Sequence, residues 1–502
     1  MKHLLIFLFA TCLSVNLFSQ NFTYFNKKLQ LPSTNLVVVA TLPLSNAYLV
    51  LGNYTNLEGR VVFIAKMDIY GDLIWIHSLE VALELGTDGG SATGTCLVQI
   101  DENNFAATYG IYKDITFEDI DIALVKFTVD GEITWKRTYG MVGENRERAY
   151  HLLHTKDNGF LLTGFRDIER FHFYIIKTDS EGEAEWEKTY SLGGTSVAFH
   201  ANETLDGGYI FSGYGKSPIT DFDMYCVKTN DKGQLQWQRN YGTNNYDSGC
   251  QVVPLSDESY ILSGGIKEDG IRKNYYAKLN NLGNIIWDKI YDLPFPDLFA
   301  IETKLIIKPD NGFIGVAVYE NEYGTYQPII MNFDSRGDTL WTKTITADPN
   351  ASVYIRDIEK IEGGYVLAGH RFFPPPQYSW ILTIDEEGNT CSEGRTYAED
   401  DFEGCDSTVV FTDIPHFPTS SSYQVQIAPN PARQQTTIHY QIPKEGVLKV
   451  YDYQGKLMES WELKMNNSSL TLEVGDWTSG VYLYQLEIGG ERLESGKLVV
   501  EN

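Results

Sequence analysis

The sequence predicts an all-β protein, and three observations point to this fold class. A motif with a fixed glycine-to-tryptophan spacing recurs roughly every 50 residues along most of the chain. The 502 residues include 32 Tyr, 25 Phe, 9 Trp and 44 Gly, which are residue types that favour strands and turns. Hydrophobic residues make up 43% of the chain and charged residues 21%, so the chain can bury a core and is not largely disordered.

In each copy of the repeated motif a tryptophan stands four residues after a glycine, as in Gly131-Glu-Ile-Thr-Trp135. The glycine supplies the positive φ that a tight turn between two strands requires. A seventh copy begins at Gly388, where Ser392 replaces the tryptophan. The remaining copies are Gly71/Trp75, Gly182/Trp186, Gly233/Trp237, Gly283/Trp287 and Gly337/Trp341.

Each repeat contains four strand-like runs separated by turns rich in Asp, Asn and Gly. In the third repeat these runs are residues 149–155, 160–165, 173–178 and 184–190. Four short antiparallel strands in a repeat of this length are typical of a β-propeller blade, and seven copies predict a seven-bladed β-propeller. The alternative is an open β-solenoid, which the meandering four-strand unit favours less.

The seventh repeat lacks an outer strand, and the N-terminal region offers a replacement. Outer strands alternate an aromatic, a basic and an aromatic residue, as in Trp186, Lys188 and Tyr190, and residues 25, 27 and 29 are Phe, Lys and Leu. We therefore predict that residues 22–30 complete the last blade and close the ring. We interpret the aromatic–basic–aromatic set as scaffold, because it recurs in most repeats.

The N-terminus has the pattern of a secretory signal peptide, residues 1–20. Lys2 and His3 precede an apolar run from residue 4 to 13, and we place cleavage near Gln20. No later segment approaches 18 continuous apolar residues, which predicts that the mature protein has no transmembrane helix. With Lys+Arg 40 and Asp+Glu 67, the net charge is −27, which argues against nucleic acid as a partner.

The propeller pattern is predicted to span residues 21–397, followed by an acidic and Ser/Pro-bearing linker at 398–427. Residues 428–502 then form a separate unit of short strands, sufficient for a small β-sandwich. Its ordered motifs comprise Pro429, Asn430, Pro431, Gly455, Lys456, Gly480, Tyr482, Gly496 and Lys497.

These motifs together resemble the type A C-terminal sorting domain of the Bacteroidetes type IX secretion system. The resemblance implies Sec export to the periplasm, recognition by the type IX machinery and passage through the outer membrane. It also implies that the sorting domain is removed and that the protein is released or held at the cell surface. The ring resembles uncharacterised repeat domains that such signals deliver, which implies no activity.

The cysteine positions and the known binding motifs indicate whether the chain holds a disulfide, a metal or a cofactor. After removal of Cys12 five cysteines remain, of which Cys391 and Cys405 are close enough in sequence to be a disulfide candidate. Zinc-ligand spacings, an EF-hand loop, a nucleophile elbow and a phosphate-binding loop are missing from the sequence, so we expect no cofactor and no metal. The acidic pairs Asp119/Asp121 and Asp221/Asp223 are interpreted as turn residues rather than calcium ligands.

One position in the innermost strand is polar in five successive repeats. Counting back 13 residues from the second-strand Gly, or its equivalent, gives apolar residues in the first two repeats and polar ones thereafter. Innermost strands line the axis of a propeller, so these residues predict a partly cationic site for a polar or anionic ligand, or simply a hydrated channel wall. The five residues are His151, His200, Gln251, Lys304 and Arg356.

The sequence thus favours an exported or cell-surface propeller that acts as a binding or interaction module. The alternative is a secreted carbohydrate-active hydrolase or lyase with its site in the channel, because propellers host both binding proteins and enzymes. No catalytic residue can be chosen from the sequence, since carboxylates are too numerous to identify an acid–base pair.

Overall fold

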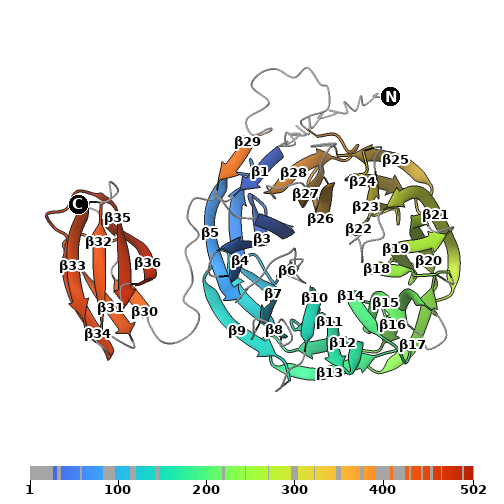
Figure 1. Ribbon diagram of the computed structural model, residues 1–502, viewed down its shortest axis with the longest axis horizontal. Coiled ribbons are helices and arrows are strands. Elements are labelled where there is room, and N and C mark those ends of the chain that lie inside the picture. The colour runs from blue at the N-terminus through green and yellow to red at the C-terminus, as the bar shows by residue number, and fades with distance from the viewer. Residues whose placement is uncertain are drawn as a thin grey trace, which may run out of the picture.

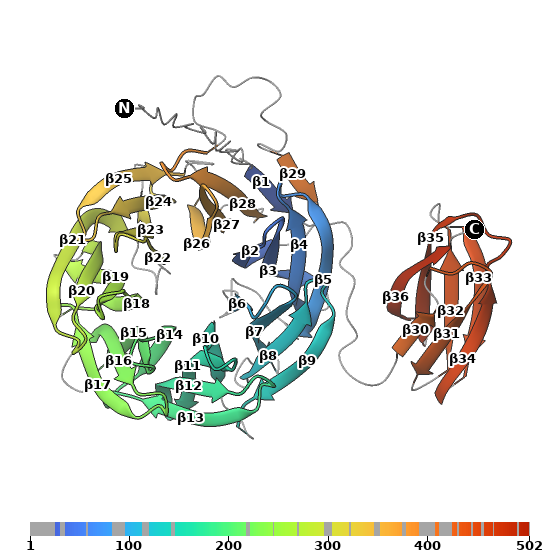
Figure 2. The same cartoon turned by 180° about the vertical axis from the view of Figure 1, so that it is seen from behind.

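The computed structural model describes residues 26–30, 36–56, 59–82, 96–112, 120–141, 146–216, 221–243, 245–268, 271–295, 304–320, 323–345, 352–373, 378–390, 407–410, 424–428, 431–442, 445–452, 456–464, 466–488 and 491–500. Within these ranges the regular secondary structure is β-strand throughout, without helices. Seven sheets stand radially around one axis, and the C-terminal strands form a separate unit (Figures 1 and 2). The predicted fold class, a seven-bladed β-propeller followed by a small β-sandwich, is confirmed.

Six of the seven sheets have four consecutive antiparallel strands, the first nearest the axis and the last at the rim (Figure 1). The first three sheets are β2 (Leu36–Pro43), β3 (Ala47–Asn56), β4 (Gly59–Asp68), β5 (Leu73–Ala82); β6 (Cys96–Gln99), β7 (Asn104–Tyr112), β8 (Ile120–Thr128), β9 (Ile133–Tyr139); and β10 (Glu147–His154), β11 (Phe160–Ile168), β12 (Arg170–Thr178), β13 (Ala184–Tyr190). The next three are β14 (Ser196–Glu203), β15 (Tyr209–Lys216), β16 (Phe222–Thr229), β17 (Leu235–Tyr241); β18 (Ser248–Pro254), β19 (Tyr260–Glu268), β20 (Ile271–Leu279), β21 (Ile285–Phe295); and β22 (Leu305–Ile307), β23 (Phe313–Glu320), β24 (Tyr326–Phe333), β25 (Thr339–Thr344).

The seventh sheet joins both ends of the ring. It contains β26 (Ser352–Ile361), β27 (Gly364–Phe373), β28 (Tyr378–Asp385), β1 (Asn26–Gln30) and β29 (Ser407–Val410) in that order. β1 pairs antiparallel with β28, so the predicted closure by the N-terminal strand is confirmed. β29 pairs parallel with β1 and comes from the stretch that we interpreted as a linker, so part of that stretch belongs to the ring. This fifth strand covers the edge that β1 would otherwise expose to another chain.

Neighbouring sheets are joined at the rim by a repeated contact. The Tyr139 hydroxyl donates a hydrogen bond to the carbonyl of Gly182 in the next sheet at 2.6 Å, and Tyr190 and Tyr241 donate to Gly233 and Gly283, each at 2.7 Å. Gly182 has φ +77°, and a Cβ there would lie 2.9 Å from the ring of Trp135. The glycine is therefore needed both for the turn and for close approach of the preceding tryptophan.

The basic residue of each rim strand also reaches the next sheet. Arg137 Nε lies 3.0 Å from Glu183 Oε1, and Lys289 pairs with Asp338. In the closing sheet, Lys27 Nζ lies 2.9 Å from Asp72 Oδ1 of the first sheet, so the ring closes with the same kind of ion pair as Arg137 and Lys289 make at their boundaries. The interpretation of these residues as scaffold agrees with this geometry.

The hydrophobic core lies between adjacent sheets. Leu49 and Leu51 of β3 pack with Phe105 and Phe127 of the second sheet, and each of the four is fully buried. Because strand side chains alternate between faces, each sheet presents one apolar face to the sheet before it and one to the sheet after it. Because both faces are buried, the two middle strands of each sheet are nearly continuous runs of apolar residues.

The C-terminal unit is a two-layer β-sandwich. One layer contains β30 (Gln424–Ala428), β31 (Gln435–Ile442) and β34 (Asn466–Glu473), and the other contains β33 (Leu457–Leu463), β32 (Gly446–Tyr451), β35 (Gly480–Ile488) and β36 (Glu491–Val500). Ile438 and Leu472 from the first layer share a buried core with Leu448, Leu486 and Leu498 from the second. Its first strand begins at residue 424, slightly before the boundary expected from the sequence.

Candidate functional site

A β-bulge in the innermost strand fixes the height of the predicted site residues. In β10, Ala149 pairs with Gly164 and His151 pairs with Thr163, which leaves Tyr150 as the extra residue. Two other sheets repeat this register, with His200 opposite Ser212 and Gln251 opposite Ser263. A bulge re-aims side chains locally, and here it sets the level of the residue that follows it.

The same level in the other sheets is occupied by residues that the sequence count partly missed. Asp357 pairs with Ala368, one position before Gly369, and Arg356 is the bulge residue. The prediction that Arg356 stands beside the other four is therefore wrong, and Asp357 holds that place. The full set of equivalent residues, which we call the axial belt, is Ala40, Cys96, His151, His200, Gln251, Lys304 and Asp357.

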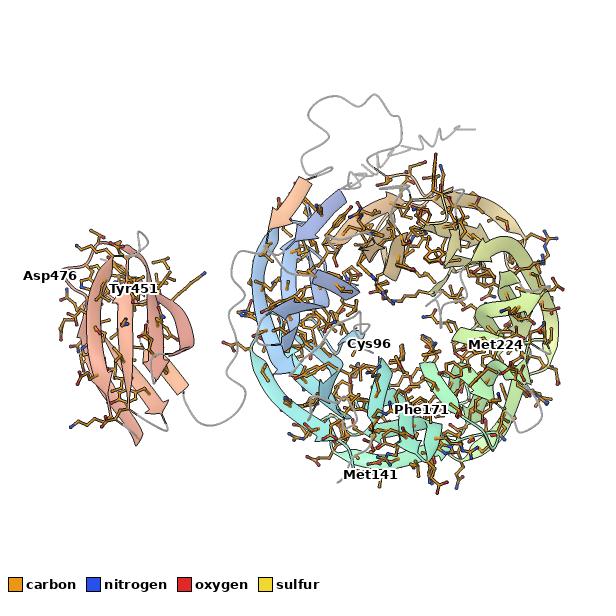
Figure 3. The ribbon with its side chains drawn as sticks, viewed as in Figure 1. Cys96, Met141, Phe171, Met224, Tyr451 and Asp476 are labelled. Carbon is orange, nitrogen blue, oxygen red and sulfur yellow. The ribbon has the colours of Figure 1, made fainter. Side chains whose placement is uncertain are left out.

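The count failed because the turn after the innermost strand varies in length. In the third sheet His154 pairs with Phe160 across the turn, whereas in the seventh Ile361 pairs with Gly364. In the first and seventh sheets this shorter turn moves the belt residue one position closer to the glycine used for counting. In the second sheet the turn is as long as in the third, but Gly110 lies one position later in its strand than Gly164 does. Figure 3 labels Cys96, one of the belt residues that the count missed, at the inner edge of the ring.

Several belt side chains bond to the backbone of the next sheet. In each case the partner is the residue that directly follows the belt residue of that sheet. Cys96 Sγ donates to the carbonyl of Leu152 at 3.6 Å, and Gln251 Oε1 accepts from the backbone N–H of Leu305. Asp357 Oδ2 accepts from the backbone N–H of Thr41 at 2.6 Å. The belt therefore links neighbouring sheets around the axis, as the rim contact does on the outside.

Lys304 is held by two carboxylates. Its ammonium bonds to Asp357 and, at 2.6 Å, to Glu359. The Asp357 side chain is 5% exposed and that of Lys304 is 27% exposed, so the pair is shielded from bulk water. Burial opposes the charge of Lys304, but Asp357 and Glu359 outweigh burial and raise the pKa of Lys304, which stays protonated.

His151 and His200 are neighbours in the belt, with ring centroids 4.2 Å apart. Burial, together with the charge of Lys304, lowers the pKa of His151 to about 3. Burial also lowers the pKa of His200 well below its usual range, partly offset by a hydrogen bond to the Val252 backbone. Both imidazoles are therefore neutral at physiological pH.

Arg356 has a different environment from the belt. Its Nε donates to His370 Nδ1 at 3.4 Å, within its own sheet. Burial and the neighbouring Arg356 charge lower the pKa of His370 well below its usual range. The expected cationic site is thus balanced: the charges of Lys304 and Arg356 are matched by Asp357 and Glu359, while the two belt histidines are neutral.

Asp357, Glu359 and Cys96 are the site residues that sequence reasoning missed. Anchoring the count on the bulge gives Asp357, whereas Cys96 follows from the pairing of its strand with β7 and Glu359 from its ion pair with Lys304. Within the described ranges no cluster of three His, Cys, Asp or Glu residues could hold a metal ion. Cys391 and Cys405 lie outside the described residues, as do Asp119 and the predicted signal peptide.

The sorting-motif residues that the structure describes occupy turns and strand starts of the sandwich. Lys456 N–H donates to Asp452 Oδ1 at 2.9 Å in the turn before β33. Gly480 begins β35, Tyr482 is buried and donates to the Thr478 carbonyl at 2.9 Å, and Lys497 pairs with Leu483. Pro431 precedes β31, and Gly496 lies in β36; Pro429, Asn430 and Gly455 lie outside the described residues.

Residues 426–501 match the family of secretion system C-terminal sorting domains. The C-terminal sandwich is a type IX secretion sorting domain. The sorting domain indicates export through the type IX machinery to the outer cell surface or the medium, as the motifs predicted. Among the described residues no helix is both long enough and apolar enough to span a bilayer.

Solved structures are similar to the ring in fold. An ulvan lyase of polysaccharide lyase family PL25 superposes with a TM-score of 0.50 at 11% identity, covering 72% of this chain and 94% of the lyase. The polysaccharide lyase Uly1 superposes with a TM-score of 0.44 at 9% identity, covering 69% and 89%. A protein of unknown function from Dyadobacter fermentans gives 0.40 at 9%, covering 72% and 97%. The search of curated proteins finds no match.

Proposed function

We propose that this protein is an exported binding protein and that its ligand is a polar molecule that contacts the axial belt. The observation that carries the proposal is a pair of buried imidazole nitrogens without hydrogen-bond partners. His151 Nδ1 and His200 Nδ1 are both buried, and neither has a hydrogen-bond partner in the described part of the chain. A buried polar atom without a partner costs free energy that a bound ligand or water can recover.

The tautomer of His200 suggests what kind of group would bind. The bond to the Val252 backbone favours the protonated ring, so the imidazole donates and the carbonyl accepts. Since Nδ1 is unpartnered, Nε2 is the donor and Nδ1 carries a lone pair. A ligand hydroxyl or N–H fits this acceptor. An anion does not, so the expected ligand class narrows from polar or anionic to polar and hydrogen-bond donating.

The alternative is a secreted carbohydrate-active hydrolase or lyase at the same place. The similarity to an ulvan lyase concerns the fold and gives no activity to this chain. Lys304 and Asp357 are engaged with each other, and Cys96 and Gln251 bond to the next sheet. These bonds favour a binding role, because side chains that hold the ring together cannot readily exchange protons with a substrate.

The proposed protein keeps the domain boundaries expected from the sequence. Residues 1–20 are a signal peptide, the ring begins at residue 21, and the C-terminal unit at 428–502 is removed on export. The strand at 407–410 indicates that a functional mature protein must extend beyond residue 397.

The test uses the full chain in a glycan-array and metabolite screen, with binding and release of products measured on the same compounds. His151→Phe and His200→Phe keep an aromatic ring and remove the Nδ1 acceptor, and His172→Phe in β12 is the matched control. We expect at least a tenfold loss of affinity from either belt variant, no loss from the control, and no product.

Binding that survives both belt substitutions overturns the axial site. If the unaltered protein depolymerises a glycan and either belt variant abolishes that activity, the enzyme alternative is favoured instead. Melting temperatures of all three variants establish that any loss of affinity is not a loss of fold.

A further inference from the structure

A second site lies at the boundary between the fourth and fifth sheets, away from the axial belt. A cavity of about 330 Å³ opens between the β14–β15 turn, the rim strand β17 and the turns of the fifth sheet. Its volume falls within the range of small-ligand pockets, roughly 300–1,000 Å³. We call it the inter-sheet groove, and its lining includes Leu205, Lys228, Trp237, Glu258, Tyr260 and Leu282.

The groove exists because a contact made at the neighbouring boundaries is missing here. Between the third and fourth sheets, Lys156 Nζ lies 3.7 Å from Glu203 Oε2, and its backbone N–H donates to the same carboxylate. Between the fifth and sixth, Ser256 Oγ donates to Asn311 Oδ1 at 3.0 Å. Leu205 stands in the place of Lys156 and Ser256, and its side chain can make neither the ion pair of Lys156 nor the hydrogen bond of Ser256.

Glu258 on the opposite wall has an unusual backbone. Its φ is +62°, a region that L side chains other than Asn and Asp rarely adopt. The equivalent turn position holds Asn158, Gly207 and Asn311 in other sheets, which are residues suited to that conformation. Glutamate is therefore an unfavourable choice at this turn position, as it is at Glu169, whose φ is +63°.

The carboxylate of Glu258 is exposed and has no hydrogen bond or ion pair in the described part of the chain. The other charges of the groove are compensated: Lys228, which is 2% exposed, lies 2.8 Å from Asp206 Oδ2 and also bonds to Gln236. The groove therefore has one uncompensated negative charge. Its apolar walls are accessible, since Leu205 is 60% and Leu282 59% exposed.

We propose that the inter-sheet groove binds an organic cation carried on an apolar body, such as a lysine or arginine side chain next to an aliphatic one in a peptide. The cation pairs with Glu258 and the apolar part lies on Leu205, Leu282 and Trp237. A carboxylate beside apolar surface favours this ligand over an anion, which it repels, and over a purely polar molecule, which gains nothing from the leucines.

The test titrates the full-length protein by calorimetry with arginyl-leucine amide and glutaminyl-leucine amide, both N-acetylated so that only the first side chain can carry a charge, and with spermidine. We expect arginyl-leucine amide to bind at least tenfold more tightly than either other probe, since one lacks the charge and the other the apolar body. Equal binding of glutaminyl-leucine amide overturns the role of Glu258. Equal binding of spermidine overturns the role of the leucines.

Three variants sharpen the result. Glu258→Gly removes the carboxylate and relieves the backbone, so it should raise the melting temperature and weaken arginyl-leucine amide at least tenfold. Leu205→Lys supplies an internal cation and should also abolish binding. Asn158→Glu places a glutamate in the equivalent strained turn position of the third sheet, so it should lower the melting temperature and leave binding unchanged. If Glu258→Gly leaves the binding of arginyl-leucine amide intact, the proposal is overturned. His151→Phe, at the axial belt, should not change that binding.

Discussion

The rim and the axis of this ring both join neighbouring sheets, but they do so through different chemical groups. At the rim, a tyrosine hydroxyl donates to a glycine carbonyl of the next sheet at four successive boundaries, from Tyr139 to Tyr291. At the axis, a thiol, an imidazole, an amide and a carboxylate each reach the next sheet from one equivalent position.

The difference shows where this sequence is free to vary. A rim contact uses a carbonyl whose position the turn glycine fixes, so one residue type, tyrosine, serves at four successive boundaries, whereas Leu29, Leu79 and Ile345 stand at this position in the other three sheets. An axial contact uses either the N–H or the carbonyl of the next strand, so donors and acceptors both serve. The axis therefore combines bonds between sheets with buried polar atoms that have no partner in the described part of the chain, such as His151 Nδ1 and His200 Nδ1.

The largest effect that separates the two regions is expected at Asp357. Asp357→Ala removes the partner of Lys304 and the acceptor of the Thr41 N–H, leaving a shielded ammonium with Glu359 alone. Breaking one side of a buried ion pair costs about 3–5 kcal/mol of unfolding free energy. Denaturant unfolding measures this loss.

Two controls define the Asp357 result. Asp357→Asn can still accept from Thr41 and should lose less than Asp357→Ala. Glu359→Gln alters the more exposed carboxylate, whose side chain is 34% accessible, and should lose less again. A surface ion pair contributes about 1 kcal/mol or less. A cost of that size for Asp357→Ala would mean that the axial contacts stabilise the ring no more than the exposed contacts of the rim do.

The second effect is the pH dependence of stability that the belt histidines cause. The pKa of His151 falls from 6.5 to about 3 on folding, so between these values the unfolded chain binds a proton that the folded chain does not. Stability from this group is complete above pH 6.5 and is lost as pH falls, by about 1.4 kcal/mol per unit. His151→Gln should flatten the fall in unfolding free energy between pH 7 and 5; a slope identical to that of the unaltered protein would contradict its burial.

The sequence predicted the rim well and the axis incompletely, for a physical reason. Rim residues are set by a glycine turn of constant geometry, so Gly131 to Trp135 can be read directly and even the closing role of Lys27 follows from spacing. Axial residues are set by a bulge and by a turn of variable length, which shifts Asp357 by one position. Charge compensation across sheets, as between Lys304 and Asp357, depends on which strands become neighbours and has no local pattern.

The smallest effect concerns the rim and tests its uniformity. Tyr139→Phe, Tyr190→Phe and Tyr241→Phe each remove one hydrogen bond to a glycine carbonyl and keep the ring packing, so each should cost about 1 kcal/mol of unfolding free energy. The three boundaries are far apart, so the triple variant should cost the sum to within about 0.5 kcal/mol. Tyr214→Phe is the control, because its hydroxyl makes no hydrogen bond in the described part of the chain. Costs that differ as widely among the three as those expected at the axis would show that the rim is not one repeated contact, since identical bonds at equivalent positions must contribute alike.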